Sequence, residues 1–415
     1  MTDPVIHFDR MAVRNLGVKD APLLDAMNEW GIGKVDGKET VHFCGLVRDK
    51  DGHTAIFLPR STRNPSMSAA RLTMKVLARY GQSAANRKFD TDGDHGNPGI
   101  LAVIQRLAVD FQNYGLFVER QRVRSRNSGK PDWKRTVTRE RAFACEGGDE
   151  VFPDIATTRA IDSSETLLAQ VQAAVIGEII EQHGWWLDGA QSRRSELRWQ
   201  KWPRQPRVLW AVLLDGLLPQ LYTARSVFLA KYLAHYLREC RASASGSLVF
   251  GVEDFHIVWE QMLGETLAWV ERNWNEKLPR AVYETSAGNT DDAPERRMLT
   301  DTVLRTGEGY TIVDAKYYAA SSATTVPGWP DIAKQMFYEM ALRSVVGEET
   351  RIRNCFVFPA PSVDAPRYRQ VEMRARIDNA SVAGFPKVEC HYMPIDEVMS
   401  AYVERRHNLM LPEGK

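Results

Sequence analysis

The strongest constraint on the fold lies in residues 297–318, whose sequence is RMLTDTVLRTGEGYTIVDAKYY. Two strand-like runs flank a Gly-Glu pair, and glycine at the first central position suits a two-residue hairpin loop. In such a hairpin Asp301 stands directly opposite Asp314, with their Cβ atoms about 5 Å apart. Because alternate side chains of a strand share one face, Lys316 lies on the face of Asp314. The stretch therefore predicts an antiparallel strand pair that gathers two carboxylates and one ammonium.

Such a grouping has a chemical use. Two carboxylates that converge repel each other unless a proton or a cation lies between them, and oxygen ligands suit Mg²⁺. A neighbouring lysine can position an attacking water and stabilise charge that develops on a phosphate. Tyr310, Ile312 and Val313 make the strand apolar, which places Asp314 at the edge of a buried element. The pattern predicts phosphodiester hydrolysis, although an Asp-x-Lys triplet alone is more often a solvated strand end.

The Asp…Asp-Ala-Lys pattern of this stretch resembles the motif of the PD-(D/E)xK nuclease superfamily. IVDAKYY, followed by DIAKQMFYEMAL at residues 331–342, is similar to McrC-like and LlaJI-type restriction endonuclease subunits. The runs FCGLV…AIFLPR at 43–60 and PDWKRTV at 131–137 also resemble the LlaJI type. The resemblance implies a restriction-endonuclease-like α/β core, in which helices flank a mixed sheet.

The resemblance also implies a metal-binding set. Asp301 and Asp314 would bind Mg²⁺, for which Mn²⁺ can substitute. Glu260 matches the acidic residue that this superfamily often supplies from the helix before the core. Two other glutamates near it, Glu253 and Glu265, could equally be the residue that points inward.

Two further catalytic residues follow from the same resemblance. Lys316 would orient the water and stabilise the transition state, and Gln335 matches a polar residue on the helix after the lysine strand. The chain departs from the pattern at Thr300, where many relatives have proline before the first aspartate. It also has Glu339 where many relatives have a tyrosine four residues after the glutamine, with Tyr338 one position earlier.

A short basic segment stands out in a chain whose formal net charge is +1, because residues 120–141 hold nine Lys or Arg against two Asp or Glu. We expect a hairpin that turns near residues 127–130, with alternate arginines on one face of its first strand. Such a row can neutralise phosphates, so the segment is a candidate DNA-binding surface. A solvated edge strand and a docking surface for an acidic protein are the alternatives. The candidate DNA-binding residues are Arg120, Arg122, Arg124, Arg126, Lys130, Lys134 and Arg135.

The order of predicted elements indicates an α+β protein of several domains. The polar run at 241–247, RASASGS, is the best candidate for a linker. We predict an N-terminal β-containing and helical region with the basic hairpin (1–150), a helical region with the linker (151–247), and a nuclease domain (248–415). Helices are expected at 67–82, 99–117, 156–186, 207–239, 250–275, 330–346 and 395–409, and strands within 40–60 and at 281–286, 297–305, 309–318, 352–359 and 367–376.

Together these features predict a Mg²⁺-dependent DNA endonuclease subunit of a prokaryotic restriction system that acts on double-stranded DNA. The sequence has no G-x-x-x-x-G-K-[ST] phosphate loop, and the resemblance implies an McrB-like AAA+ GTPase as the motor partner. With no apolar run of 18 residues and no secretory signal, a cytoplasmic location away from membranes is expected. The alternatives are a non-catalytic DNA-binding or assembly module with a nuclease-like fold, and a RecB-like repair nuclease.

Overall fold

The computed structural model describes residues 4–17, 21–29, 34–35, 40–87, 98–145, 147–163, 165–189, 191–240, 247–286, 288–292, 299–361 and 368–411. The chain forms two compact units, one of residues 1–102 with 243–415, the other of residues 103–242. These units differ from the three-part division at residues 150 and 247, whose functional labels stay predictions. Of the predicted linker, 241–246 lie outside the described residues. No described helix is long and apolar enough to cross a membrane.

The first unit contains a sheet, here called the N-terminal sheet, with strand order β1-β5-β4-β11. Its strands are β1 (Val5–Phe8), β5 (Thr54–Leu58), β4 (Cys44–Arg48) and β11 (Leu248–Val252). β4 and β5 confirm the two strands predicted within residues 40–60. Both ends of the predicted 250–275 helix are wrong, because residues 248–252 pair with β4, with Gly45 opposite Gly251, and the helix covers only Phe255–Thr266. A Cβ at Gly45 would stand 2.2 Å from a backbone oxygen, so the close pairing requires glycine there.

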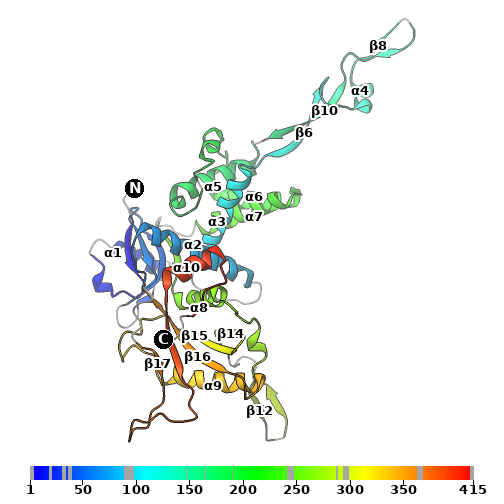
Figure 1. The fold of residues 1–415 in the computed structure, drawn as a ribbon. Coiled ribbons are helices and arrows are strands. Elements are labelled where there is room, and N and C mark those ends of the chain that lie inside the picture. Colours follow the sequence, from blue (N-terminus) through cyan, green and yellow to red (C-terminus); the bar gives the residue numbers. More distant parts are fainter. Residues whose placement is uncertain are drawn as a thin grey trace. The chain divides into compact units, whose positions relative to one another are not determined.

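A second sheet in this unit, the central sheet, carries the predicted hairpin and has the order β14-β15-β16-β18-β17. β15 pairs antiparallel with β14 and parallel with β16, so the sheet is mixed. Figure 1 shows α8 and α9 on opposite sides of these strands, and the sheet residues of β15 and β16 are mostly buried. The strands of the central sheet are β14 (Thr302–Thr306), β15 (Gly309–Ala315), β16 (Ile352–Ala360), β17 (Gln370–Val371) and β18 (Val388–Pro394). The longer helices of the first unit are α2 (Met67–Arg87), α8 (Phe255–Thr266), α9 (Trp329–Val346) and α10 (Ile395–Glu404).

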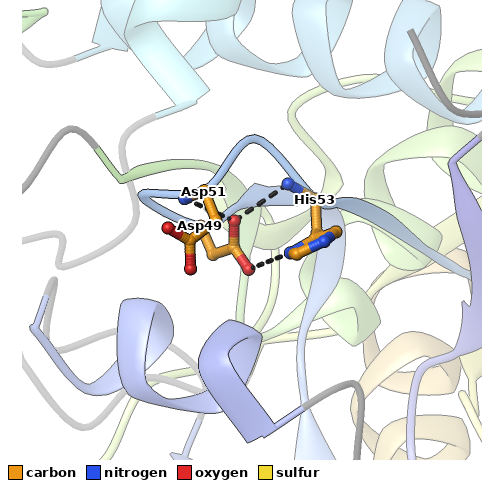
Figure 2. A group of neighbouring side chains, drawn as sticks. All are labelled: Asp49, Asp51 and His53. Atoms are coloured by element: carbon orange, nitrogen blue, oxygen red, sulfur yellow. Dashed lines mark hydrogen bonds and ion pairs between the residues drawn. The ribbon is translucent and has the colours of Figure 1, made fainter.

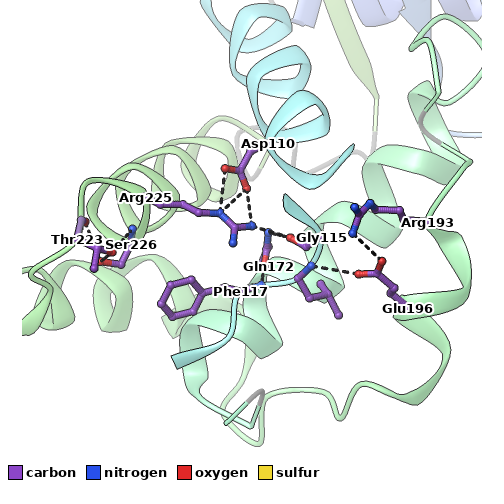
Figure 3. Close-up of polar contacts among 10 residues, drawn as sticks. Asp110, Gly115, Phe117, Gln172, Arg193, Glu196, Thr223, Arg225 and Ser226 are labelled. Atoms are coloured by element: carbon purple, nitrogen blue, oxygen red, sulfur yellow. Dashed lines mark hydrogen bonds and ion pairs between the residues drawn. The ribbon is translucent and has the colours of Figure 1, made fainter. Parts of the chain in front are cut away.

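The residues of the second unit form helices and a ribbon, in which two long strands pair along their length and a third, short strand pairs with one of them. The helices are α3 (Pro98–Tyr114), α5 (Leu167–His183), α6 (Arg207–Leu217) and α7 (Ala224–Glu239). Arg225 of α7 forms a bidentate pair with Asp110 of α3 and donates to the Gly115 carbonyl at 2.6 Å (Figure 3). The fully buried Gln172 of α5 accepts the Phe117 amide at 2.6 Å. These polar contacts fix the end of α3 against α5 and α7.

The ribbon differs from the predicted hairpin. β6 (Glu119–Arg126) pairs along its length with β10 (Ala156–Ser163), not with residues 133–135. The chain does turn after β6, but β7 (Lys130–Pro131) pairs with β10, and α4 (Trp133–Arg139) follows. The predicted helix at 156–186 is therefore wrong in its first part. Asp132 explains α4, because its side chain caps the helix by accepting the Arg135 amide. Figure 1 shows α4 and β8 beyond the far end of the ribbon.

Shorter elements complete the described chain. They are α1 (Ala21–Glu29), β2 (Lys34–Val35), β3 (Val41–His42), β8 (Phe143–Ala144), β9 (Glu150–Val151), β12 (Val282–Glu284), β13 (Thr290–Asp292) and the 3₁₀ turns Val13–Asn15, Arg194–Trp199, Leu218–Gln220 and Trp274–Glu276.

Candidate active site

The hairpin of β14 and β15 brings Asp301 and Asp314 to the same end of the strands. Thr302 pairs with Val313, so these aspartates come next in the register. Asp301 Oδ2 accepts the Ala315 amide at 2.8 Å, which ties the half-buried Asp301 to the strand of Asp314. Asp314 is 1% exposed. Burial, followed by repulsion from Asp301, raises the pKa of Asp314 to about 6.

A third carboxylate approaches this pair from α8. Burial raises the pKa of Glu260 to about 7, and the charges of Asp301 and Asp314 add to the effect. The other glutamates near it have different surroundings. Glu265 pairs with Arg79 at 2.6 Å, and Glu253 lies ahead of the helix. Of the three glutamates weighed from the sequence, Glu260 is thus the one whose charge is coupled to both aspartates.

Lys316 contributes the cation of the cluster. Its Nζ lies 2.7 Å from Asp314 Oδ2 and 2.7 Å from Asp331 Oδ1, and Asp331 belongs to the first turn of α9. Burial alone would lower the pKa of Lys316, but the Asp314 and Asp331 carboxylates outweigh it and raise the pKa above its usual value. Lys334 Nζ lies 3.9 Å from Asp314 Oδ1. The cluster therefore holds charged ammonium groups beside carboxylates that resist ionisation.

The segment before Asp301 is clamped by hydrogen bonds. Asn275 Oδ1 accepts from the amide and the hydroxyl of Thr300, both at 2.8 Å, and its Nδ2 donates to the Thr300 carbonyl at 3.0 Å. The Tyr338 hydroxyl donates to the carbonyl of Leu299. These contacts fix the backbone at Thr300, where relatives of the predicted superfamily often have proline.

Gln335 occupies an unusual environment. Its side chain is fully buried on α9, one helical turn after Asp331, and neither of its polar atoms has a hydrogen-bond partner among the described residues. A buried amide without partners costs about 1–3 kcal/mol. Such a group fits a site in which a further ligand or water provides the missing partner.

The donor set of Asp301, Asp314 and Glu260 fits a hard divalent cation, because all three offer oxygen and their mutual repulsion favours a positive charge between them. As a trio they spread wider than 4.8 Å. Among the described residues, the only His, Cys, Asp or Glu trio whose ligand atoms all lie within 4.8 Å is Asp49, Asp51 and His53.

That second trio stabilises a turn. Asp49 Oδ1 accepts the amides of Asp51 and His53, both at 2.9 Å, and Asp49 Oδ2 pairs with the His53 ring at 2.9 Å (Figure 2). Burial opposes ionisation of Asp49, but the bonds from His53 prevail and lower its pKa. The carboxylate is satisfied within the predicted turn between β4 and β5.

Comparison with known proteins gives the family. The family model described as LlaJI restriction endonuclease matches residues 43–402, which is most of the chain. The chain belongs to the LlaJI restriction endonuclease family. The LlaJI-type resemblance of the sequence is thereby confirmed. No curated protein matches. A solved structure, the cryo-EM structure of the Thermococcus gammatolerans McrBC complex, contains a chain 10% identical to this LlaJI-family protein, with a TM-score of 0.33, 63% of this chain covered and 86% of that chain.

The candidate DNA-binding residues of this LlaJI-family protein lie on the ribbon and on α4. Arg120, Arg122, Arg124 and Arg126 are exposed and alternate along β6, so they share one face as predicted. Across from them on β10 are Asp162, Ala160, Thr158 and Ala156. Arg126 pairs with Glu140 at 3.2 Å. Lys130 lies in β7, and Lys134 and Arg135 lie in α4 instead of the predicted return strand.

Sequence reasoning missed two residues of the site. Asp331 precedes Gln335 by four positions in one helix, a spacing that places both on one face and could have identified it. Asn275 had no comparable signal, because its contact with Thr300 depends on where the chain runs after α8.

Proposed function

We propose that this LlaJI-family chain is a Mg²⁺-dependent endonuclease subunit of a restriction system, with a PD-(D/E)xK-type site, and that it hydrolyses phosphodiester bonds of double-stranded DNA. The observation that carries this proposal is the grouping of Asp301, Asp314 and Glu260, whose charges repel one another, beside Lys316. Family membership supports the nuclease class.

Each residue of the proposed site would have its own role. Asp301, Asp314 and Glu260 would hold Mg²⁺, or Mn²⁺ in its place, and the bound cation would supply Lewis-acid polarisation of a phosphate oxygen. Lys316 stays charged next to Asp314 and can donate a hydrogen bond to the attacking water or to a phosphate oxygen. Gln335 would provide a buried amide that orients the groups around the cation.

We further propose that the arginine face of β6 contacts the DNA backbone. Of its four arginines, Arg126 has an acidic partner in Glu140, and Asp162 lies across from Arg120. Arg122 and Arg124 stand opposite uncharged residues. These two side chains are therefore the best placed to neutralise phosphates.

The resemblance to McrC-like subunits is the support for an AAA+ GTPase partner, and we place the chain in the cytoplasm with its DNA. A pull-down with an McrB-like subunit tests that assembly. DNA cleavage that occurs at full rate without any motor subunit would contradict it.

The central test is cleavage of closed circular plasmid with Mg²⁺. Asp314→Ala and Lys316→Ala should each abolish cleavage and leave the circular dichroism spectrum unchanged, whereas the exposed-site control Asp378→Ala should cut normally. Full cleavage by a folded Asp314→Ala/Lys316→Ala double variant would remove the assignment. DNA binding without cleavage or metal response would favour the non-catalytic module, and degradation only from free ends would favour a RecB-like nuclease.

A further inference from the structure

Tyr317 joins two parts of the first unit that the proposed mechanism treats separately. It follows Lys316 directly at the end of the β15 segment, and it is 6% exposed. Its ring packs on Phe255, with ring centroids 5.2 Å apart, and Phe255 is the first residue of α8. One side chain thus contacts the start of the helix that carries Glu260.

The hydroxyl of Tyr317 reaches the N-terminal sheet. It accepts the backbone amide of Arg60 at 2.9 Å, and it lies near enough to the Asp9 carboxylate for the two groups to interact electrostatically. Asp9 is 2% exposed, and its Oδ1 accepts the Phe43 amide at 3.1 Å. The Asp9 amide in turn donates to the Leu58 carbonyl at 2.7 Å.

These contacts have a common location. Asp9 follows the end of β1 and Arg60 follows the end of β5, and the two strands are parallel neighbours. The Tyr317 hydroxyl therefore meets the carboxyl ends of two adjacent strands at once. The same sheet also contains β11, which leads through a short connection into α8.

We propose that Tyr317 is a positioning residue, which fixes Lys316 and Glu260 relative to each other by anchoring both to the N-terminal sheet through its hydroxyl and ring. The inference rests on the proposed nuclease function and deepens it. The N-terminal sheet thus sets the geometry of the site, although none of its own strands carries a predicted catalytic residue.

The chemistry of the contact favours positioning over simple packing. A phenylalanine would keep the contact with Phe255 and would avoid burying a hydroxyl beside the buried carboxylate of Asp9. Buried polar groups are costly unless every partner is satisfied, and they specify one arrangement of the elements that carry them. A displacement of about 1 Å in a catalytic group can cost as much as 100-fold in rate.

The test compares Tyr317→Phe with Tyr392→Phe. Tyr392 is also 6% exposed and donates a hydrogen bond, to the Ala320 carbonyl at 3.1 Å, but this contact stays within the nuclease core. We expect both variants to lose similar thermal stability. Only Tyr317→Phe should lower kcat for plasmid cleavage, by about tenfold or more, with KM for DNA unchanged.

Asp9→Asn provides an independent variant if Tyr317→Phe folds poorly. It should lower kcat in the same direction, and the Asp9→Asn/Tyr317→Phe double variant should lose less than the product of the single losses, because both residues belong to one group of contacts at the ends of β1 and β5. Equal kcat values for Tyr317→Phe and Tyr392→Phe, or fully multiplicative losses, would overturn the inference.

Failure of the proposed function is recognised separately. If the unaltered protein and Asp314→Ala both leave DNA intact, the nuclease assignment fails, and Mn²⁺ titration followed by thermal shift then decides the positioning role. Weaker Mn²⁺ binding by Tyr317→Phe than by Tyr392→Phe would support it. Equal Mn²⁺ binding by the two variants would contradict it.

Discussion

Lys316 Nζ lies 2.7 Å from Asp331 Oδ1, so the lysine of the central strand pair is held by a carboxylate from the first turn of α9 as well as by Asp314. This second partner fixes the ammonium between strand and helix. The proposed role of Lys316 therefore depends on Asp331, a residue outside the proposed metal-binding trio.

Replacing Asp331 tests that dependence. Asp331→Asn should reduce cleavage by about 10- to 100-fold, the usual range for partners that orient an active group, because Lys316 loses one of its two carboxylates. Steady-state plasmid cleavage measures the effect. Glu397→Gln is the matched control, since it also removes an acid from a first helical turn, that of α10. If both variants cut at the same rate, Asp331 serves only the helix terminus.

The raised pKa of Glu260 predicts how stability varies with pH. The pKa of Glu260 rises from 4.5 to about 7 on folding, so the folded protein binds more protons than the unfolded chain between these two pH values. The stabilisation is complete below about pH 4.5 and is lost as the pH rises through about 7. Thermal melts of metal-free protein between pH 4.5 and 8 should therefore decline less steeply for Glu260→Gln than for the unaltered protein.

The pKa of Glu389 is lowered, so its effect on stability has the opposite dependence on pH. Hydrogen bonding from His391, with a further contribution from Arg353, lowers the pKa of Glu389 to about 2. Its stabilisation is present above about pH 4.5 and is lost as the pH falls towards 2. Glu389→Gln should thus change the acid limb of the stability curve and leave the limb above pH 4.5 parallel to that of the unaltered protein. The same slopes in all three proteins would show that neither carboxyl is linked to folding as described.

Gln335 and Gln172, both fully buried, should respond in opposite ways to substitution by leucine. Gln335→Leu removes an amide whose polar atoms have no partner among the described residues, so the free energy of unfolding should rise by about 1–3 kcal/mol while cleavage falls. Gln172→Leu leaves the Phe117 amide unpaired and should cost about 1–3 kcal/mol. Urea unfolding measures both. A destabilised Gln335→Leu would mean that this amide already has its partners.

The arginine face of β6 makes a prediction about salt. An Arg122→Gln/Arg124→Gln variant should lower the slope of log K against log salt by about 1.8, which is about 0.9 per lost phosphate contact. Arg159→Gln is the control, because Arg159 pairs with Val123 and so shares the other face of the ribbon. DNA-binding isotherms between 50 and 200 mM salt, as an approximate working range, measure the slopes. Equal slopes for the two variants would favour a protein-docking surface.

The central hairpin was predictable because its information is local. A Gly-Glu loop fixes the register of β14 and β15, and the register by itself places Asp301 beside Asp314 and Lys316 two residues further. The helix of Gln335 and the turn at Asp49 were predictable for the same reason. Periodicity and turn residues act over a few positions, and the structure contains the elements that they predict.

Other predictions failed where a distant segment decided the outcome. Residues 248–252 became β11 because β4, about 200 positions earlier, offered an unpaired edge. β10 replaced a predicted helix because it pairs with the whole of β6. β18 was missed although Val388, Cys390 and Tyr392 alternate with polar residues, and only its pairing places it between β16 and β17.

The sequence by itself thus determined the family, the mixed α and β content and the local geometry of the aspartates and lysine. Only the tertiary structure decided that Glu260 faces them, that Asp331 and Asn275 belong to the site, and that Tyr317 anchors it to the N-terminal sheet. The physical reason is that strand register follows from neighbouring residues, whereas hydrogen bonds between distant segments exist only after the sheets have packed.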